Sequence, residues 1–494
     1  MRGEIARGAG WMLLFKAVDR VLGVVSTLVL ARLLIPADFG LVAMAMSVIA
    51  LIELASAFNF EAALIQRKDL SRDHYDTAWT LNLGLGVACA VLTALLAYPT
   101  AAIYGEPRLQ IVMFVLAAGR LAASFESIGP VEFRRAMDFR KEFVFLSSKR
   151  LLAFVVTLIL AFVFRSYWAL VIGSVFGRVA GVVLSFLMQP HRVRLSLAAS
   201  RELFGFSGGL LAVNLLGAVI ARAPHFFVGK LNGPQALGSY TLGSELAYMP
   251  SVELIAPINR AVFPGYARLA HDAEKLRDTF LDVIGAILLL ALPASVGLAV
   301  VAEPMVRVLL GERWIEAVPV IRVLAFAGAL AAVTSNNGSV YMALGRTWLF
   351  PIALTARLVV LLVGLLLLAP HLGVIGAAYA ELIAYGVSML VSYPLLFRVL
   401  HVPVGRYLAR AWRPVVASAA MGYVAFEATA AIPAGATSVS VLPQLLGGVA
   451  SGVATYLGAL WLLWRLAGRP RGAEAAALEQ AERAIARLRA LRSA

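Results

Sequence analysis

Cysteine and charge are both scarce in this sequence of 494 residues. The single cysteine, Cys89, excludes a disulfide within the chain and a metal site built from several cysteines. Only 14% of the residues are charged and 61% are hydrophobic, whereas about a quarter of the residues in a soluble protein are charged. The composition therefore predicts an all-α polytopic membrane protein.

Motifs for several kinds of enzyme chemistry are also missing. The sequence has no phosphate-binding GxxxxGK[ST] and no zinc-binding HExxH, and its six histidines are scattered. These absences leave no visible position for ATP hydrolysis or for metalloprotease chemistry. We therefore expect a protein that is not an enzyme and that has no metal and no cofactor.

Apolar stretches long enough to cross a bilayer recur along the whole chain. A helix of about 20 apolar residues spans the hydrocarbon core, and about 14 such stretches can be placed. They are residues 11–34, 40–60, 78–98, 110–129, 143–164, 168–188, 203–228, 237–258, 280–301, 318–344, 348–369, 373–396, 411–432 and 442–464.

Lysine and arginine are distributed unevenly between the two sides of these stretches. Cytoplasmic loops are the ones enriched in these residues, so the richer side, which carries both termini, is predicted to be cytoplasmic. The net charge of +15 then reflects loops that face anionic lipid and does not indicate a nucleic-acid partner. The poorer side holds Arg108, Arg165, Lys230, Arg307 and Arg313.

An internal repeat relates the first six stretches to the next six. Corresponding stretches run in the same direction, which predicts two pseudo-symmetric six-helix lobes around a central cavity, plus two C-terminal helices. The matched residues are Pro36 with Pro234, Gly40 with Gly238, Glu106 with Glu312, and Arg150 with approximately Arg357.

The repeat also predicts how the chain is divided. Residues 1–202 would form an N-terminal lobe, residues 203–400 a C-terminal lobe, and residues 401–466 the two additional spans. Residues 467–494 would form a cytoplasmic tail. Apolar residues recur at helical spacing between 474 and 492, so we expect an amphipathic helix in this tail.

Charged residues occur where lipid would exclude them. Lys16, Asp19 and Arg20 share one face of the first predicted span. A charge near the middle of a bilayer costs at least about 2.5 kcal/mol, so this face must line a watery cavity or pair with other helices. Glu53 lies about two-thirds of the way along the second span.

Four loop motifs resemble those of a known family. They are residues 33–41 (LLIPADFGL), 63–68 (ALIQRK), 104–107 (YGEP), and 133–135 (FRR) followed by Phe139. With them the chain resembles the polysaccharide transport branch of the MOP flippase superfamily over roughly residues 5–465. The similarity is to the Wzx-like exporters, in particular those of the colanic-acid type.

This resemblance implies both a fold and a function. The family would move an undecaprenyl-diphosphate-linked oligosaccharide repeat unit, used for O-antigen or exopolysaccharide, from the inner to the outer leaflet of the bacterial inner membrane. Transport would proceed by alternating access, coupled to an H⁺ or Na⁺ gradient or to the membrane potential. Polysaccharide polymerases and glycosyltransferases would be possible partner proteins, and membrane lipids would surround the chain.

Such a cargo carries a diphosphate, for which arginine is the best-suited side chain because its planar fork can donate two hydrogen bonds at once. Each arginine could instead form an interhelical ion pair or extend to the membrane interface, and for Arg178 the expected partner is Glu126 or Glu381. The candidate diphosphate- and sugar-binding residues are Arg20, Arg222, Arg357, Arg178, Lys16 and Asn214.

Acidic residues inside the spans are candidates for ion coupling. Glu53 is our first candidate and Asp19 the second, because a carboxylate inside the membrane can exchange a proton or hold a cation. The alternative for each is a static partner of a basic group.

Other functions remain open at this stage. A multidrug or cation antiporter of the same superfamily would favour carboxylates and aromatic residues over arginines in its cavity. A peptidoglycan lipid-precursor flippase would share the charge pattern, and only the loop motifs disfavour it. A membrane glycosyltransferase or polymerase is less favoured, because the predicted outward loops near 98–110 and 302–317 are short.

Overall fold

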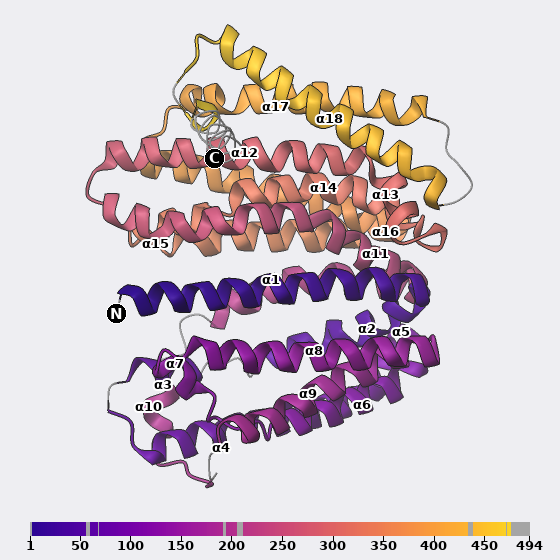
Figure 1. Cartoon of the computed structure of the whole chain (residues 1–494), viewed down its shortest axis with the longest axis vertical. Helices are drawn as coiled ribbons and strands as arrows, with labels where there is room; N and C mark the ends of the chain where they lie inside the picture. Colours follow the sequence, from indigo (N-terminus) through magenta and orange to yellow (C-terminus); the bar gives the residue numbers. More distant parts are fainter. Residues whose placement is uncertain are drawn as a thin grey trace, which may run out of the picture. The chain divides into compact units, whose positions relative to one another are not determined.

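The computed structural model consists of helices joined by short turns (Figure 1). It describes residues 2–55, 60–67, 69–190, 194–204, 211–432, 438–470 and 472–475. None of these residues is in a strand, and the predicted all-α class is confirmed.

The chain divides into two compact units, which we call the N-unit, Met1–Gly238, and the C-unit, Ser239–Ala494. The finer boundaries at residues 202, 400 and 466 stay predictions. The amphipathic helix expected at 474–492 lies outside the described residues from residue 476 onward.

In the N-unit, long helices pack side by side and short helices lie at both of their ends (Figure 1). Helix α8 packs between α1 and α9, and α6 packs against α4 and α9. This packing brings charged residues of α1, α2, α6, α8 and α9 close together. The helices are α1 Arg2–Leu33, α2 Pro36–Ala55, α3 Phe60–Gln66, α4 Arg72–Leu95, α5 Ala97–Tyr104, α6 Arg108–Ala123, α7 Val131–Arg135, α8 Phe139–Phe164, α9 Trp168–Met188, α10 Ser200–Phe204 and the first part of α11 Leu211–Leu269.

The C-unit holds the rest of α11 and the remaining helices. One of its core clusters contains Tyr266, Phe280 and Tyr341, each almost fully buried. Helix α12 packs against α14 and α17, and α14 packs against α16. The elements are α12 Ala273–Val300, α13 Ala302–Leu309, the 3₁₀ turn η2 Glu312–Trp314, α14 Ala317–Thr334, α15 Asn337–Ala343, α16 Leu349–Leu400, α17 Val404–Ala431 and α18 Ser438–Leu466.

Two of the long helices are broken by glycines with positive φ. Gly233 (φ 79°) interrupts α11 and Gly373 (φ 60°) interrupts α16. A residue with a side chain rarely adopts this backbone conformation, so glycine is the residue that permits the break. Gly233 lies between the predicted spans 203–228 and 237–258, and Gly373 is the first residue of the predicted span 373–396, so α11 and α16 each run through parts of two predicted spans.

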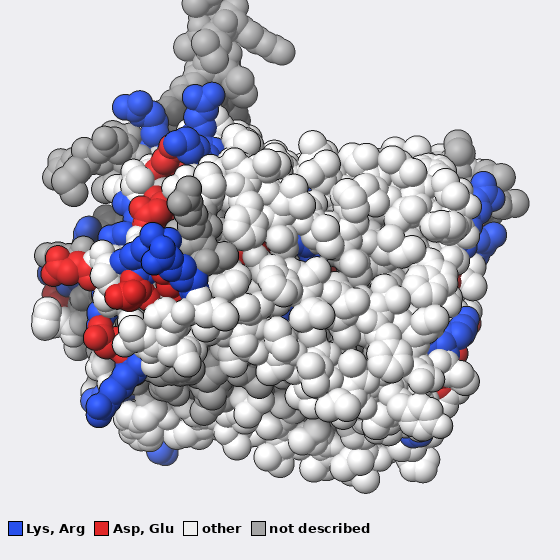
Figure 2. Space-filling view, turned by 90° about the horizontal axis from the view of Figure 1, so that it is seen from below, with Lys and Arg blue, Asp and Glu red and all other residues white. Residues whose placement is uncertain are grey.

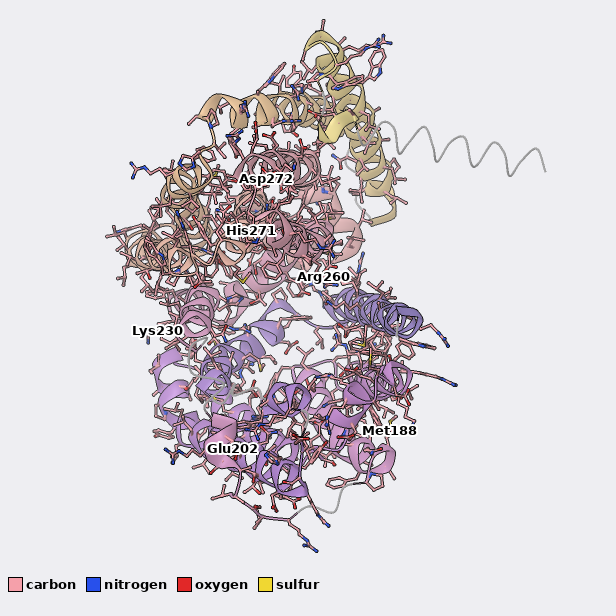
Figure 3. The ribbon with its side chains drawn as sticks, turned by 90° about the vertical axis from the view of Figure 1, so that its left-hand side faces the viewer. Met188, Glu202, Lys230, Arg260, His271 and Asp272 are labelled. Carbon is pink, nitrogen blue, oxygen red and sulfur yellow. The ribbon has the colours of Figure 1, made fainter. Side chains whose placement is uncertain are left out.

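The apolar surface is that of a multi-pass membrane protein. Figure 2 shows one face of the molecule, where charged side chains gather at the ends and a broad band between them has few. Figure 3 shows the helices nearly end-on, with Asp272 and His271 at the turn before α12.

Nine helices of the described residues are long and apolar enough to cross a membrane. The polytopic prediction is confirmed, and the number of about 14 spans stays a prediction. The nine are Pro36–Leu54, Arg72–Leu95, Phe139–Phe164, Trp168–Met188, Ala273–Val300, Ala317–Ala343, Leu349–Leu400, Val404–Ala431 and Ser440–Leu466.

Candidate functional site

The polar face of α1 is covered in part by an arginine from α8. Arg150 Nε lies 2.8 Å from the Asp19 carboxylate. Its guanidinium also passes Gly23, where an added Cβ would be 3.6 Å from Nη2. Asp19 and Gly23 are one turn apart, so Arg150 lies along the predicted face. Asp19 therefore pairs across helices and not with its neighbour Arg20, which is half-buried on α1.

Glu53 of α2 is flanked by two arginines. Arg178 Nη2 of α9 donates to Glu53 Oε1 at 3.1 Å, and Arg120 Nε of α6 lies 3.8 Å from the same oxygen. The expected partners of Arg178, Glu126 and Glu381, are not the observed ones. The expected partners were wrong because the tertiary packing places Arg178 of α9 beside Glu53 of α2. Helix periodicity alone cannot predict which helices are neighbours.

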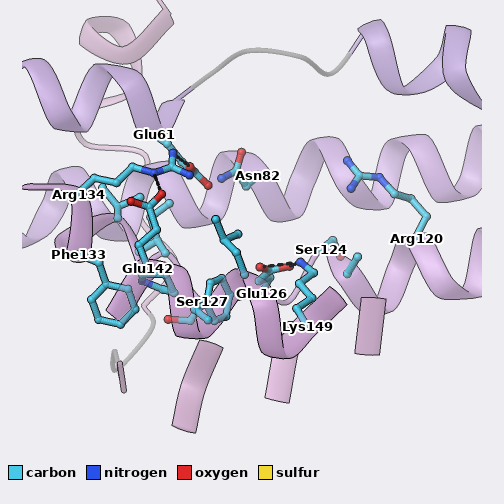
Figure 4. A pocket seen from close by; sticks show the side chains of 16 residues that line it. Glu61, Asn82, Arg120, Ser124, Glu126, Ser127, Phe133, Arg134, Glu142 and Lys149 are labelled. Carbon is cyan, nitrogen blue, oxygen red and sulfur yellow. Dashed lines mark hydrogen bonds and ion pairs between the residues drawn. The ribbon is translucent and has the colours of Figure 1, made fainter. Parts of the chain in front are cut away.

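A cavity of about 370 Å³ lies in the N-unit beside these ion pairs. Lys149 Nζ donates to both oxygens of Glu126, at 3.0 and 2.8 Å. Figure 4 shows this pair inside the cavity, with Arg120 apart from it. Three acids and three bases balance the charge of the lining, which favours polar contacts with a neutral group over capture of an anion. They are Glu61, Glu126 and Glu142, and Arg120, Arg134 and Lys149.

One wall of this cavity belongs to the FRR motif. Arg134 lies between Glu142, whose Oε1 is 2.5 Å from Nε, and Glu61, whose Oε2 is 3.1 Å from Nη1 (Figure 4). This arginine joins α3, α7 and α8, because each contributes one of the three side chains. The motif thus fastens three helices together.

The other loop motifs make similar attachments. Asp38 of the LLIPADFGL motif is 8% exposed and accepts hydrogen bonds from the backbone N–H groups of Ile35, at 3.2 Å, and Tyr167, at 3.0 Å. Arg67 of the ALIQRK motif pairs with Glu202, and the hydrogen bond from Arg67 lowers the pKa of that carboxyl.

The YGEP motif joins α5 to α2 and contains an ion pair with Arg108. Tyr104 Oη and Ser47 Oγ are 2.9 Å apart. Arg108 donates to both oxygens of Glu106, at 2.8 and 2.9 Å, and these hydrogen bonds hold the pKa of Glu106 below its usual value. The motifs of this chain therefore have structural roles.

In the C-unit, Arg357 is held by an aromatic ring, unlike the ion-paired arginines of the N-unit. Its Cζ lies 3.4 Å from the ring centroid of Tyr385, so the guanidinium stacks on the aromatic face. Glu381, one turn before Tyr385, is 8% exposed and accepts hydrogen bonds from the hydroxyls of Tyr240 and Tyr248. Sequence reasoning missed this tyrosine cluster, because its members lie far apart in the chain.

The remaining candidates are on α1 and α11 of the N-unit. Lys16 and Asn214 are exposed, and Arg222 is half-buried. The structure thus brings Asp19, Glu53 and Arg178 into a set of ion pairs, and it places Arg357 in a separate cluster. The binding and coupling roles of all these residues stay predictions.

The sequence model of a protein family matches a long part of this chain. The family is described as "Polysaccharide biosynthesis protein", and the match covers residues 29–319, which is more than half of the chain. The chain belongs to this family. The resemblance to the polysaccharide transport branch of the MOP superfamily is thereby confirmed.

Two curated relatives extend the similarity to most of the sequence. The "Lipopolysaccharide biosynthesis protein WzxC" of Escherichia coli is 25% identical over 440 residues, which are 86% of this chain and 89% of that protein. The "Teichuronic acid biosynthesis protein TuaB" of Bacillus subtilis is 26% identical over 374 residues, 74% of this chain and 77% of that protein.

A solved structure supports the fold. The chain is similar to "Lipid II flippase MurJ, inward closed conformation", with a TM-score of 0.69 at 13% identity, covering 92% of this chain and 99% of that one. At this identity the likeness concerns the fold alone.

Proposed function

We propose that this protein is a flippase that moves an undecaprenyl-diphosphate-linked oligosaccharide repeat unit across the bacterial inner membrane, for O-antigen or exopolysaccharide synthesis. Membership of the polysaccharide biosynthesis family carries this proposal. Two relatives support it by name, the lipopolysaccharide protein above and the "Succinoglycan biosynthesis transport protein ExoT" of Rhizobium meliloti, 25% identical over 338 residues.

The basic side chains inside the spanning helices support a cargo that carries a diphosphate. A diphosphate that crosses hydrocarbon needs cations along its path, and arginine binds phosphate through paired hydrogen bonds. We assign this role to Arg357 first, because its charge is stacked on a tyrosine and not paired with an acid. Arg20, Arg222, Lys16 and Asn214 are further candidates, and Arg178 would have to leave Glu53 to take part.

The transport cycle would be alternating access coupled to an H⁺ or Na⁺ gradient. Glu53 and Asp19 are the proposed coupling carboxylates, and each would exchange its arginine partner for the ion. Both termini would lie in the cytoplasm, as the distribution of basic loops predicts. Polysaccharide polymerases and glycosyltransferases are proposed partners, since they make the cargo and consume it.

Deletion of the gene in its native host tests the function. We expect completed lipid-linked repeat units to accumulate in the cytoplasmic leaflet, where periodate added to intact spheroplasts cannot oxidise their sugars. Complementation with the wild-type chain should restore oxidation. Normal export together with increased drug sensitivity would contradict the proposal and favour a drug antiporter.

A further inference from the structure

In the part of the chain that the structure describes, Arg357 forms no ion pair, although Glu381 is near enough to attract it electrostatically. Among the residues that the structure describes, no carboxylate lies within ion-pair distance of its guanidinium. Its Nε is buried and has no hydrogen-bond partner, and its Cζ rests 3.4 Å from the Tyr385 ring centroid. Arg150, which the predicted repeat matches approximately with Arg357, is instead paired with Asp19 at 2.8 Å. One arginine is thus neutralised by an acid, whereas the other is stacked on a tyrosine.

An acid that could neutralise Arg357 is close by. Glu381 and Tyr385 are four residues apart on α16, so their side chains leave the same face of the helix. Because Arg357 is stacked on Tyr385, one turn from Glu381, the Glu381 carboxylate is near enough to interact electrostatically with the guanidinium. A half-buried guanidinium and a buried carboxylate this close would form an ion pair if the carboxylate were free to turn towards the arginine.

Two tyrosines of α11 hold the Glu381 carboxylate by hydrogen bonds. Tyr240 Oη donates to Glu381 Oε1, and Tyr248 Oη donates to Oε2. Tyr240 is fully buried, and the Tyr248 ring lies 6.2 Å from that of Tyr385. Both oxygens of Glu381 are therefore occupied by neutral hydrogen-bond donors, which stabilise the carboxylate in addition to the longer-range attraction of Arg357.

We propose that Tyr240 and Tyr248 are positioning residues that keep Glu381 away from Arg357, so that Arg357 is available to a phosphate group of the cargo. The inference rests on the proposed function and adds a way in which the phosphate is released from Arg357. If α11 moves and a tyrosine leaves Glu381, the carboxylate pairs with Arg357 and displaces the phosphate. The exchange replaces one ion pair by another and requires no covalent step.

Binding of undecaprenyl diphosphate to the full chain in nanodiscs tests this inference, with undecaprenol as the uncharged comparison. Tyr248→Phe removes one donor and should weaken binding of the diphosphate by roughly tenfold or more, the loss typical of one charge-assisted hydrogen bond. Tyr240→Phe should act in the same direction. Binding of undecaprenol should not change in either variant.

The decisive variant is the double substitution. Glutamine cannot form an ion pair with Arg357, so Tyr248→Phe combined with Glu381→Gln should restore the affinity of the wild type. A purely structural role for the tyrosine predicts that the double variant binds no better than Tyr248→Phe. Tyr423→Phe, at a C-unit tyrosine that is 68% exposed, is the matched control and should bind normally.

The outcomes separate this inference from the function on which it rests. A wild-type protein that binds undecaprenol as tightly as the diphosphate would overturn both the anion site and the proposed cargo. A wild type that prefers the diphosphate, with Tyr248→Phe unchanged or with no recovery in the double variant, would overturn the role of the tyrosines alone. Size-exclusion profiles and thermal midpoints show whether each variant is folded.

Discussion

Gly40 lies against Pro234, and Gly238 lies against Pro36. Each glycine therefore contacts the proline that the repeat matches with its own. A Cβ added to Gly40 would be 1.7 Å from the carbonyl oxygen of Pro234, and one added to Gly238 would be 1.8 Å from that of Pro36. Each glycine is four residues after its own proline, and the second motif is 198 positions after the first. The two copies of the repeat therefore cross each other inside the N-unit, reciprocally and backbone to backbone.

This crossing predicts that alanine is not tolerated at either glycine. Gly40→Ala and Gly238→Ala each place a methyl group inside a backbone carbonyl, which cannot rotate away as a side chain can. We expect each variant to lose about 1–3 kcal/mol or more of stability, as in other overpacked sites, and to show a lower thermal midpoint in detergent. The measurement is the fraction of monodisperse protein after heating.

Gly84→Ala on α4 is the matched control for these variants. Nothing lies within 4 Å of a Cβ added there, and alanine favours the helix. The control should be as stable as the wild type or more so. A Gly40→Ala protein that melts together with Gly84→Ala would contradict the crossing.

The repeat is a prediction from the sequence, whereas the contact between its two matched Pro–Gly segments could not be predicted. Matching prolines and glycines at one offset indicates a duplicated unit, and the long apolar stretches locate its helices. The contact between the copies depends on how the chain turns at Gly233, whose φ of 79° follows from packing and not from local pattern.

A second prediction concerns Asp38, which joins the start of α2 to the start of α9. Its two oxygens accept from the backbone N–H groups of Ile35 and Tyr167. Asp38→Ala leaves both backbone donors without their charged acceptor and should cost about 1–3 kcal/mol for each lost hydrogen bond. Asp38→Asn keeps one acceptor and should lose less. Equal thermal midpoints for the two variants would contradict this role.

A third prediction concerns the beginning of the C-terminal tail. Arg413 of α17 and Glu474 form a buried ion pair, with Nε and Nη2 both 2.8 Å from Oε1 and both side chains 5% exposed. Glu474→Ala leaves a buried cation without its partner, which should destabilise the C-unit by about 3–5 kcal/mol. The midpoint of thermal aggregation in detergent measures the loss.

Two further variants control this experiment. Replacing both members, Arg413→Met with Glu474→Met, removes the buried charges together and should be milder than Glu474→Ala alone. Asp278→Ala breaks an exposed pair with Arg406, whose side chains are more than half exposed, and should change little. If all three variants melt at the same temperature, the tail is not held by this pair.

The candidate site could be predicted only in part, because periodicity gives the face of a helix and not its neighbour. Lys16, Asp19 and Arg20 share a face as the sequence indicates, and an ion pair was one of the two expectations for that face. That Arg150 supplies the partner depends on the packing of α8 on α1. The expectation that Arg178 meets Glu126 or Glu381 was wrong for the same reason, since Glu126 is paired with Lys149.

The last prediction tests Glu53 as the coupling carboxylate. Arg178 and Arg120 both approach its Oε1, so an ion that binds Glu53 must displace two guanidinium groups, and their release would move α9 and α6 relative to α2. Such a change links ion binding to helix movement, which a coupling group must do. We expect Glu53→Gln to abolish the dependence of transport on external pH or Na⁺ in proteoliposomes, while Glu126→Gln, which breaks the neighbouring pair with Lys149, retains it. Transport by Glu53→Gln that follows external pH and Na⁺ as the wild type does, with only a lower thermal midpoint, would show that Glu53 is a static partner of its two arginines.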